Sequence, residues 1–134
     1  MKRLVIGSLF LCMAIAANAQ NAADRAKAHF ARTYPDLRYE DVVEEGGLVI
    51  GFINTDGLPG EAVYGEDGGW LYTSITVKDV PANVRSGAMK TYPGARFTGY
   101  KKVTRQDGVM YNLYLEMPDG GAFDIYVDGS GREI

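Results

Sequence analysis

His29 is the only histidine in the 134-residue sequence, so acid–base or nucleophilic catalysis would depend on it. It lies in an expected helix beside Phe30, and a Ser–His–Asp arrangement would need it near Ser74, Ser86 or Ser130. No nucleophile motif surrounds any of these serines. The sequence therefore assigns no catalytic residue and favours a protein that is not an enzyme.

Acidic residues are plentiful, but most lie next to glycines in expected turns, where aspartate hydrogen-bonds the local backbone. Neither 67–69 nor 128–131 has the oxygen spacing and closing glutamate of a calcium loop. One histidine and one cysteine, Cys12, cannot make a zinc site. Spacing alone leaves a hydrolytic carboxylate pair open, yet nothing singles out two residues. No glycine-rich loop precedes a helix to hold phosphate. We expect no metal and no cofactor.

The N-terminus has the pattern of an export signal. Lys2 and Arg3 precede an apolar run over 4–17, and Ala17-Asn18-Ala19 fits a cleavage site. The run is shorter than the about 20 residues of a spanning helix. We expect residues 1–19 to be a signal peptide removed after Ala19, leaving a domain of residues 20–134 in the periplasm or secreted. Cys12 leaves with the signal, so the mature chain forms no disulfide.

The charge of the mature chain excludes some partners. Loss of Lys2 and Arg3 lowers the basic residues from 14 to 12 against 17 acidic ones, a net charge of −5. This sign argues against nucleic acid and anionic membranes as partners. No other stretch could insert into a membrane after signal cleavage.

The rest of the chain resembles two copies of one unit, about 22–77 and about 78–134. Thr33-Tyr34-Pro35 recurs at 91–93, a sequence offset of 58, and the i, i+4, i+8 spacing upstream matches. Farther along the offset grows to 62, where 63–66 aligns with 125–128. A loop insertion of about four residues explains this drift.

Each unit begins with a helix and continues as short strands. The first helix is expected from about Ala22 to Tyr34. The second should begin after an N-cap at Asp79, with Pro81 in its first turn. Pro35 and Pro93 end the two helices. Glycine turns separate strands near 38–43, 48–54, 61–66, 70–77, 96–104, 109–117 and 122–128, with a short piece at 132–134. The fold class is α+β: two tandem helix-plus-antiparallel-strand repeats forming one sheet, with helices on one face.

Strand alternation divides the side chains between the two faces of the sheet. In the second unit Leu113 and Ile125 should meet the helices, and Tyr114 and Tyr126 should face solvent. When these faces are carried back to the first unit by the sequence offset, Val63, Leu71 and Ile75 are expected inside. Tyr100 is a further candidate for the exposed face. The open face would then carry an aromatic set: Phe52, Tyr64, Trp70, Tyr72, Tyr114 and Tyr126. Such sets anchor protein–protein contacts, although tyrosine also favours strands, and a one-residue slip would reverse a face.

The ordered motifs resemble the PepSY-like family of small periplasmic proteins from Bacteroides and its relatives. The motifs are Tyr64-Gly-Glu-Asp-Gly-Gly-Trp-Leu-Tyr-Thr73, the helix start at 79–84, 91–95, 111–115 and the hairpin at 126–131. The resemblance covers about 22–134, with departures at Gly65 and at 56–60. It implies a fold similar to beta-lactamase inhibitor proteins, whose aromatic concave sheet grips an enzyme. It supplies no catalytic residues.

Two hypotheses follow for the function. The first is an exported binding or inhibitor-like module that holds a periplasmic protein or peptide on the aromatic face. The alternative is a small-ligand carrier or an enzyme with an unrecognised site, which would need a closed pocket with converging polar groups. A purely structural envelope protein would have neither.

Overall fold

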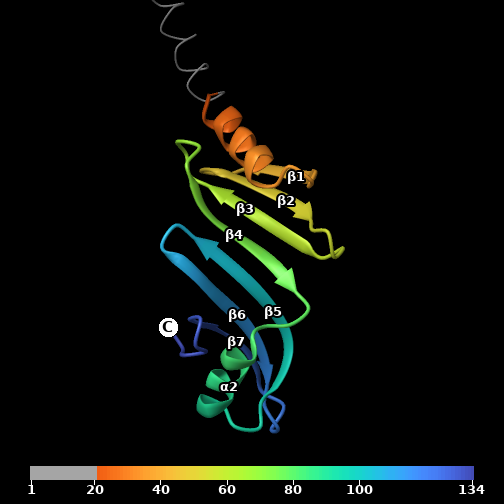
Figure 1. Cartoon of the computed structure of the whole chain (residues 1–134), viewed down its shortest axis with the longest axis vertical. Helices are drawn as coiled ribbons and strands as arrows, with labels where there is room; N and C mark the ends of the chain where they lie inside the picture. The colour runs from red at the N-terminus through yellow and green to blue at the C-terminus, as the bar shows by residue number, and fades with distance from the viewer. Residues whose placement is uncertain (1–20) are drawn as a thin grey trace, which may run out of the picture.

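The strands form one continuous antiparallel meander. The computed structural model describes residues 21–134, and the predicted signal at 1–19 lies outside them. A helix over residues 21–33 precedes four strands, and α2 precedes three more (Figure 1). The sheet order is β1 to β7, so every strand pairs with its neighbour in sequence. The strands and second helix are β1 (Tyr39–Glu44), β2 (Leu48–Ile53), β3 (Pro59–Tyr64), β4 (Trp70–Val77), α2 (Ala82–Thr91), β5 (Arg96–Arg105), β6 (Gly108–Glu116) and β7 (Ala122–Val127). The predicted α+β class is confirmed.

The start of α2 differs from the prediction. Pro81, not Asp79, is the N-cap residue, and no side chain caps the helix. Asp79 lies two residues earlier, where it accepts a hydrogen bond from the Val80 amide at 2.8 Å and pairs with Arg85. These contacts, the amide first, hold the pKa of Asp79 below its usual value. Asp79 therefore anchors the chain before the helix instead of capping it.

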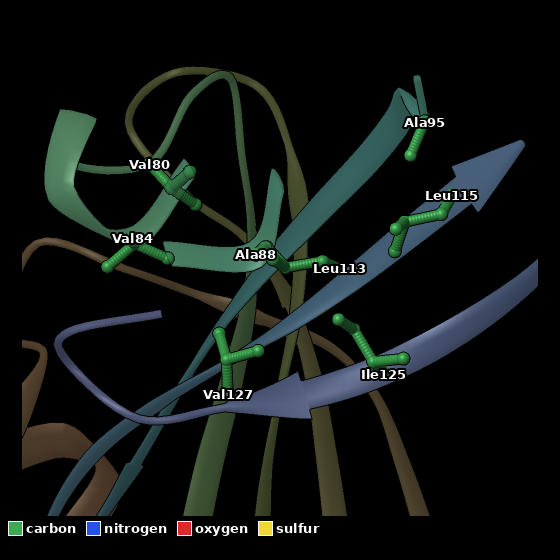
Figure 2. Close-up of a cluster of buried hydrophobic side chains, with 8 residues drawn as sticks. All are labelled: Val80, Val84, Ala88, Ala95, Leu113, Leu115, Ile125 and Val127. Carbon is green, nitrogen blue, oxygen red and sulfur yellow. The ribbon is translucent and has the colours of Figure 1, made fainter. Parts of the chain in front are cut away.

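Both helices cover the same face of the sheet, and each has its own core. The N-terminal helix buries Ala26 and Phe30 against β2 and β3, while α2 buries Val84 and Ala88 against β6 and β7. In Figure 2, Val84 and Ala88 lie over Leu113 on β6 and over Ile125 and Val127 on β7. Full burial of an aliphatic side chain such as valine or leucine contributes roughly 1.5–3 kcal/mol. Cross-strand partners Ile75, Lys102 and Tyr111 connect the two cores along one face.

The two helices correspond at the predicted offset. Ala26 and Val84 are both 0% exposed, and Phe30 and Ala88 are both 1% exposed. Both helices end with the same backbone hydrogen bond. The Tyr34 amide donates to the carbonyl oxygen of Phe30, and the Tyr92 amide donates to that of Ala88. The shared spacing thus reflects one mode of helix packing used twice.

The predicted offset of 62 for the strands is wrong, and the structure gives 63. The turn closed by a hydrogen bond from the Asn54 amide to the Leu58 carbonyl oxygen recurs 63 residues later, where the Met117 amide donates to Gly121. The turn in which the Gly65 amide donates to Gly69 recurs in the same way, from Asp128 to Arg132. The pairing of Tyr64 with Trp70 recurs at the same offset, as the bridge between Val127 and Glu133. The insertion in the second unit is therefore one residue longer than predicted, and the β5–β6 hairpin is the longer one. Because strand side chains alternate, an error of one residue exchanges the two faces.

Candidate functional site

The candidate site is the sheet face opposite the helices, which we call the open face. Register places Tyr72 of β4 beside Arg105 of β5. The next row runs from Lys101 through Asn112 to Tyr126, across β5, β6 and β7. Residues from both units thus meet on this face.

A shallow hollow of about 220 Å³ lies on the open face. A second hollow of about 200 Å³ adjoins it and shares Glu61, Ser74 and Lys101. The first hollow is lined by Glu61, Tyr72, Ser74, Lys101, Val103, Arg105, Asn112, Tyr114, Asp124 and Tyr126. A larger hollow of about 670 Å³, lined in part by Arg25 and Asp67, lies at the start of the described chain and contains none of these tyrosines. Unlike this larger hollow, the open-face hollow combines aromatic, cationic and acidic side chains.

Tyr114 lies across β5 because its neighbour there has no side chain. Its cross-strand partner is Gly99, where an added Cβ would be 3.5 Å from Tyr114 Cδ2. The register between β5 and β6 shifts between Phe97 and Gly99, so Thr98 is the extra residue of a bulge. Lys101 Nζ lies 5.7 Å from the centre of the Tyr114 ring, within cation–π range. The ring and the ammonium group therefore share one part of the hollow.

A buried amide fixes the polar floor of the hollow. Asn112 is 3% exposed, and its Nδ2 donates to Asp124 Oδ2 at 2.9 Å and to the carbonyl oxygen of Ile125 at 3.1 Å. Both partners are on β7. A buried polar group that is satisfied in this way holds its partner in one orientation. Asp124 is thereby held at the β7 side of the hollow.

Three predicted open-face aromatics lie on the helix face instead. Phe52 is 2% exposed and Tyr64 is 1% exposed, both in the core beneath the N-terminal helix, and Trp70 packs against the same core. The one-residue error in the offset explains Phe52 and Tyr64: their equivalents are the buried Leu115 and Val127, not Tyr114 and Tyr126.

A bulge explains why Trp70 and Tyr72 face opposite ways although they are two residues apart. Tyr64 pairs with Trp70 but Val63 pairs with Tyr72, so Leu71 is an extra residue. The prediction that Leu71 lies inside is wrong because the bulge leaves it 53% exposed. Val63, the partner of Tyr72, belongs to the open face and not to the core, whereas Ile75 packs inside as predicted.

Tyr100 also faces the helices. It packs against the core under α2 and accepts a hydrogen bond from Arg85 at 3.0 Å. Its partner Leu113 is 0% exposed, and cross-strand partners share a face. Of the predicted aromatic set, Tyr72, Tyr114 and Tyr126 remain on the open face, and Tyr126 is the most exposed of them at 49%.

His29 belongs to an aromatic cluster on the helix face. Its Nδ1 shares a 2.8 Å hydrogen bond with the Tyr64 hydroxyl, and its ring stacks on Trp70 with centroids 5.7 Å apart. Burial, followed by the nearby Arg32, lowers the pKa of His29. Burial raises the pKa of Tyr64 to about 12. None of Ser74, Ser86 and Ser130 is bonded to His29, whose one side-chain hydrogen-bond partner within residues 21–134 is Tyr64.

Within residues 21–134, no three His, Cys, Asp or Glu side chains gather in a way that could hold a metal ion. No helix in the same range is long and apolar enough to cross a membrane.

The same fold occurs in solved structures of Bacteroides proteins. A BLIP-like protein from Bacteroides fragilis matches with a TM-score of 0.65 and 15% identity, over 83% of this chain and 82% of that one. The chain has a BLIP-like fold. A DUF2874 family protein from Bacteroides uniformis gives a TM-score of 0.70 and 14% identity, over 82% and 84% of the two chains. A protein from Bacteroides eggerthii, described as a candidate periplasmic protein, gives a TM-score of 0.69 and 14% identity, over 83% of this chain and 84% of that one. No protein-family model and no curated protein matches the sequence.

Proposed function

We propose that this protein is an exported binding module that holds a segment of a periplasmic protein or peptide on the open face. The observation that carries this proposal is the convergence of Tyr72, Tyr114 and Tyr126 from β4, β6 and β7 around one hollow. Tyrosine combines a large, rigid apolar ring with a polar hydroxyl, and it is enriched among the anchor residues of interfaces.

The size and openness of the hollow favour a partner's surface over a small molecule. Its volume of about 220 Å³ is below the roughly 300–1,000 Å³ that encloses a drug-sized ligand. A protein segment can instead cross several strands and fill both adjoining hollows. Phe52, Tyr64 and Trp70 are left out of the proposed contact set because they serve the core beneath the N-terminal helix.

The wider assignment rests on sequence. Residues 1–19 act as the signal peptide, and residues 20–134 form one domain of two units, about 22–77 and 78–134. We assign the protein to the periplasm and to the PepSY-like group, as a non-enzymatic module without a metal or cofactor. The similar Bacteroides eggerthii structure, described as that of a periplasmic protein, and the BLIP-like fold support this view.

Photo-crosslinking in the native cell envelope tests the proposal. A benzoylphenylalanine placed at Tyr114 or Tyr126 should crosslink a discrete partner. The same group at Phe123, which is 39% exposed and packs beside Tyr92 on the helix face, should not. Equal crosslinking from both faces, or none from the open face, would contradict an open-face contact.

Alanine variants supply the energetic test on that partner. Loss of Tyr72 or Tyr114 should weaken binding by about tenfold or more, as for anchor residues at an interface. Leu71→Ala is the matched control, because Leu71 is exposed beside Tyr72 but does not line the hollow. A melting curve for each variant separates lost binding from lost folding. Weakening by Leu71→Ala alone would place the contact elsewhere.

A further inference from the structure

The open face has a distinctive charge pattern. Lys101 and Arg105 lie on the same face of β5, at the middle of the hollow, and Tyr114 and Tyr72 flank them. Neither cation takes part in the two ion pairs found within residues 21–134, which join Arg85 to Asp79 and Arg96 to Glu116. The mature sequence is acidic overall, so two neighbouring cations outside any ion pair are a local exception within the described residues.

The acidic side chains of the hollow lie at its two sides. Glu61 is on β3, two strands from β5 in one direction, and Asp124 is on β7, two strands away in the other. Asp124 already accepts the Asn112 amide hydrogen bond. Across the strands the order of charge is therefore negative, positive, negative.

We propose that the segment bound on the open face carries a single acidic side chain that docks between Lys101 and Arg105, and that its neighbouring residues are not acidic. This inference rests on the proposed function and names the partner's chemistry. Hydrogen bonds between a carboxylate and a cation are about twice as strong as neutral ones, and flanking rings that exclude water strengthen them further. Glu61 and Asp124 repel a run of acidic residues, so one carboxylate is selected over a polyanion.

A selection on the purified mature chain tests this chemistry. The probe is a displayed library of linear nine-residue peptides, from which binders are sequenced and resynthesised. Aspartate or glutamate should be enriched at one position, with neutral or basic residues on each side. Replacing that acid with its amide should weaken binding by about tenfold or more, and so should adding an acidic residue on either side.

Protein variants assign the effect to the two cations. Lys101→Met and Arg105→Met should each weaken the acidic peptide about tenfold or more and leave its amide form unchanged. Lys102→Met is the matched control, because Lys102 is next in sequence but faces the helix side. Lys101→Arg and Arg105→Lys should retain most of the binding, and all variants should melt like the parent chain.

The outcomes separate the two proposals. Peptides that need Tyr114 but show no preference for an acid, or bind Lys101→Met and Arg105→Met unchanged, overturn this inference and leave the proposed function standing. Peptides that bind Tyr114→Ala as well as the parent chain overturn both. A library that yields no binder also overturns both.

Discussion

The ring of Phe52 lies over Gly60, its cross-strand partner on β3. A Cβ on Gly60 would be 2.7 Å from Phe52 Cζ and 3.2 Å from the carbonyl oxygen of Ser74. The ring therefore occupies the space that a side chain on the neighbouring strand would need. This contact lets a large aromatic residue fill the core under a helix whose own buried residues are few.

Gly60→Ala should destabilise the fold because it inserts a methyl group into this contact. We expect the free energy of unfolding to fall by about 1–3 kcal/mol, measured by chemical denaturation. Gly51→Ala is the control on β2, since its Cβ would meet the nearest atom at an ordinary 3.7 Å. Adding Phe52→Leu to Gly60→Ala should recover part of the loss relative to the sum of the single variants. Strict additivity would show that the ring is not the cause.

Gly131→Ala should cost more than its neighbour Gly129→Ala. Gly131 has a φ of +85°, and a Cβ there would lie 2.2 Å from the carbonyl oxygen of Val84 on α2. An added Cβ at Gly129 meets nothing within 4 Å. Thermal or chemical unfolding should show a loss of about 2 kcal/mol or more for Gly131→Ala and less than about 0.5 kcal/mol for Gly129→Ala. Similar losses for both would mean that the turn does not press against α2.

The order of elements could be predicted from the sequence because its signals are local. Glycine turns and alternating apolar residues mark the strands within one or two residues of their bounds, and Pro35 and Pro93 follow the ends of both helices. The burial of Leu113 and Ile125 also follows from alternation within a single strand.

The faces of the first unit could not be predicted because they depend on register and bulges. The extra residue at Leu71 reverses the side chains before it relative to those after it, and no residue type in the sequence marks the bulge. The sequence offset between the two units is still 58 at the bonds that follow the helices, where Leu37 in the first unit corresponds to Ala95 in the second. It is 63 at the next equivalent turn, where Asn54 corresponds to Met117, so the insertion lies between these points. No motif recurs within this interval, so the amino-acid sequence does not determine the length of the insertion. Once the β2–β3 register is known, Phe52 is opposite the side-chain-free Gly60, a pairing that favours a ring packed across the strand.

The stability of the fold should depend on pH through His29. Because burial lowers the pKa of His29 in the folded chain, the unfolded chain binds a proton first as the pH falls. Stability from this group is fully present above its ordinary pKa of 6.5 and is lost as the pH falls through the folded value. Protonation also makes Nδ1 a donor, which changes its bond to Tyr64.

Denaturation between pH 7.5 and 5.5 measures this effect. The parent chain should lose more stability over this range than His29→Gln, which cannot titrate, and NMR titration should give His29 a pKa below 6.5. Tyr64→Phe is a useful companion because it removes the hydroxyl and keeps the ring in the core. Equal pH slopes for the parent chain and His29→Gln would contradict the assignment.

Asn112 and Asp124 should behave as a coupled pair on the floor of the hollow. In Asn112→Asp two carboxylates would replace the 2.9 Å amide–carboxylate bond, and the new oxygens would also face the carbonyl of Ile125. We expect a loss of about 2 kcal/mol or more at pH 7, because like charges at this separation oppose each other and one is buried. The loss should shrink as the pH is lowered toward 5, since one proton shared by the pair removes the repulsion. The Asn112→Asp/Asp124→Asn double variant reverses the direction of the hydrogen bond, and it should recover part of the loss at pH 7. If the double variant is as unstable as the sum of the single ones, the pair does not interact, and Asp124 is positioned by β7 alone.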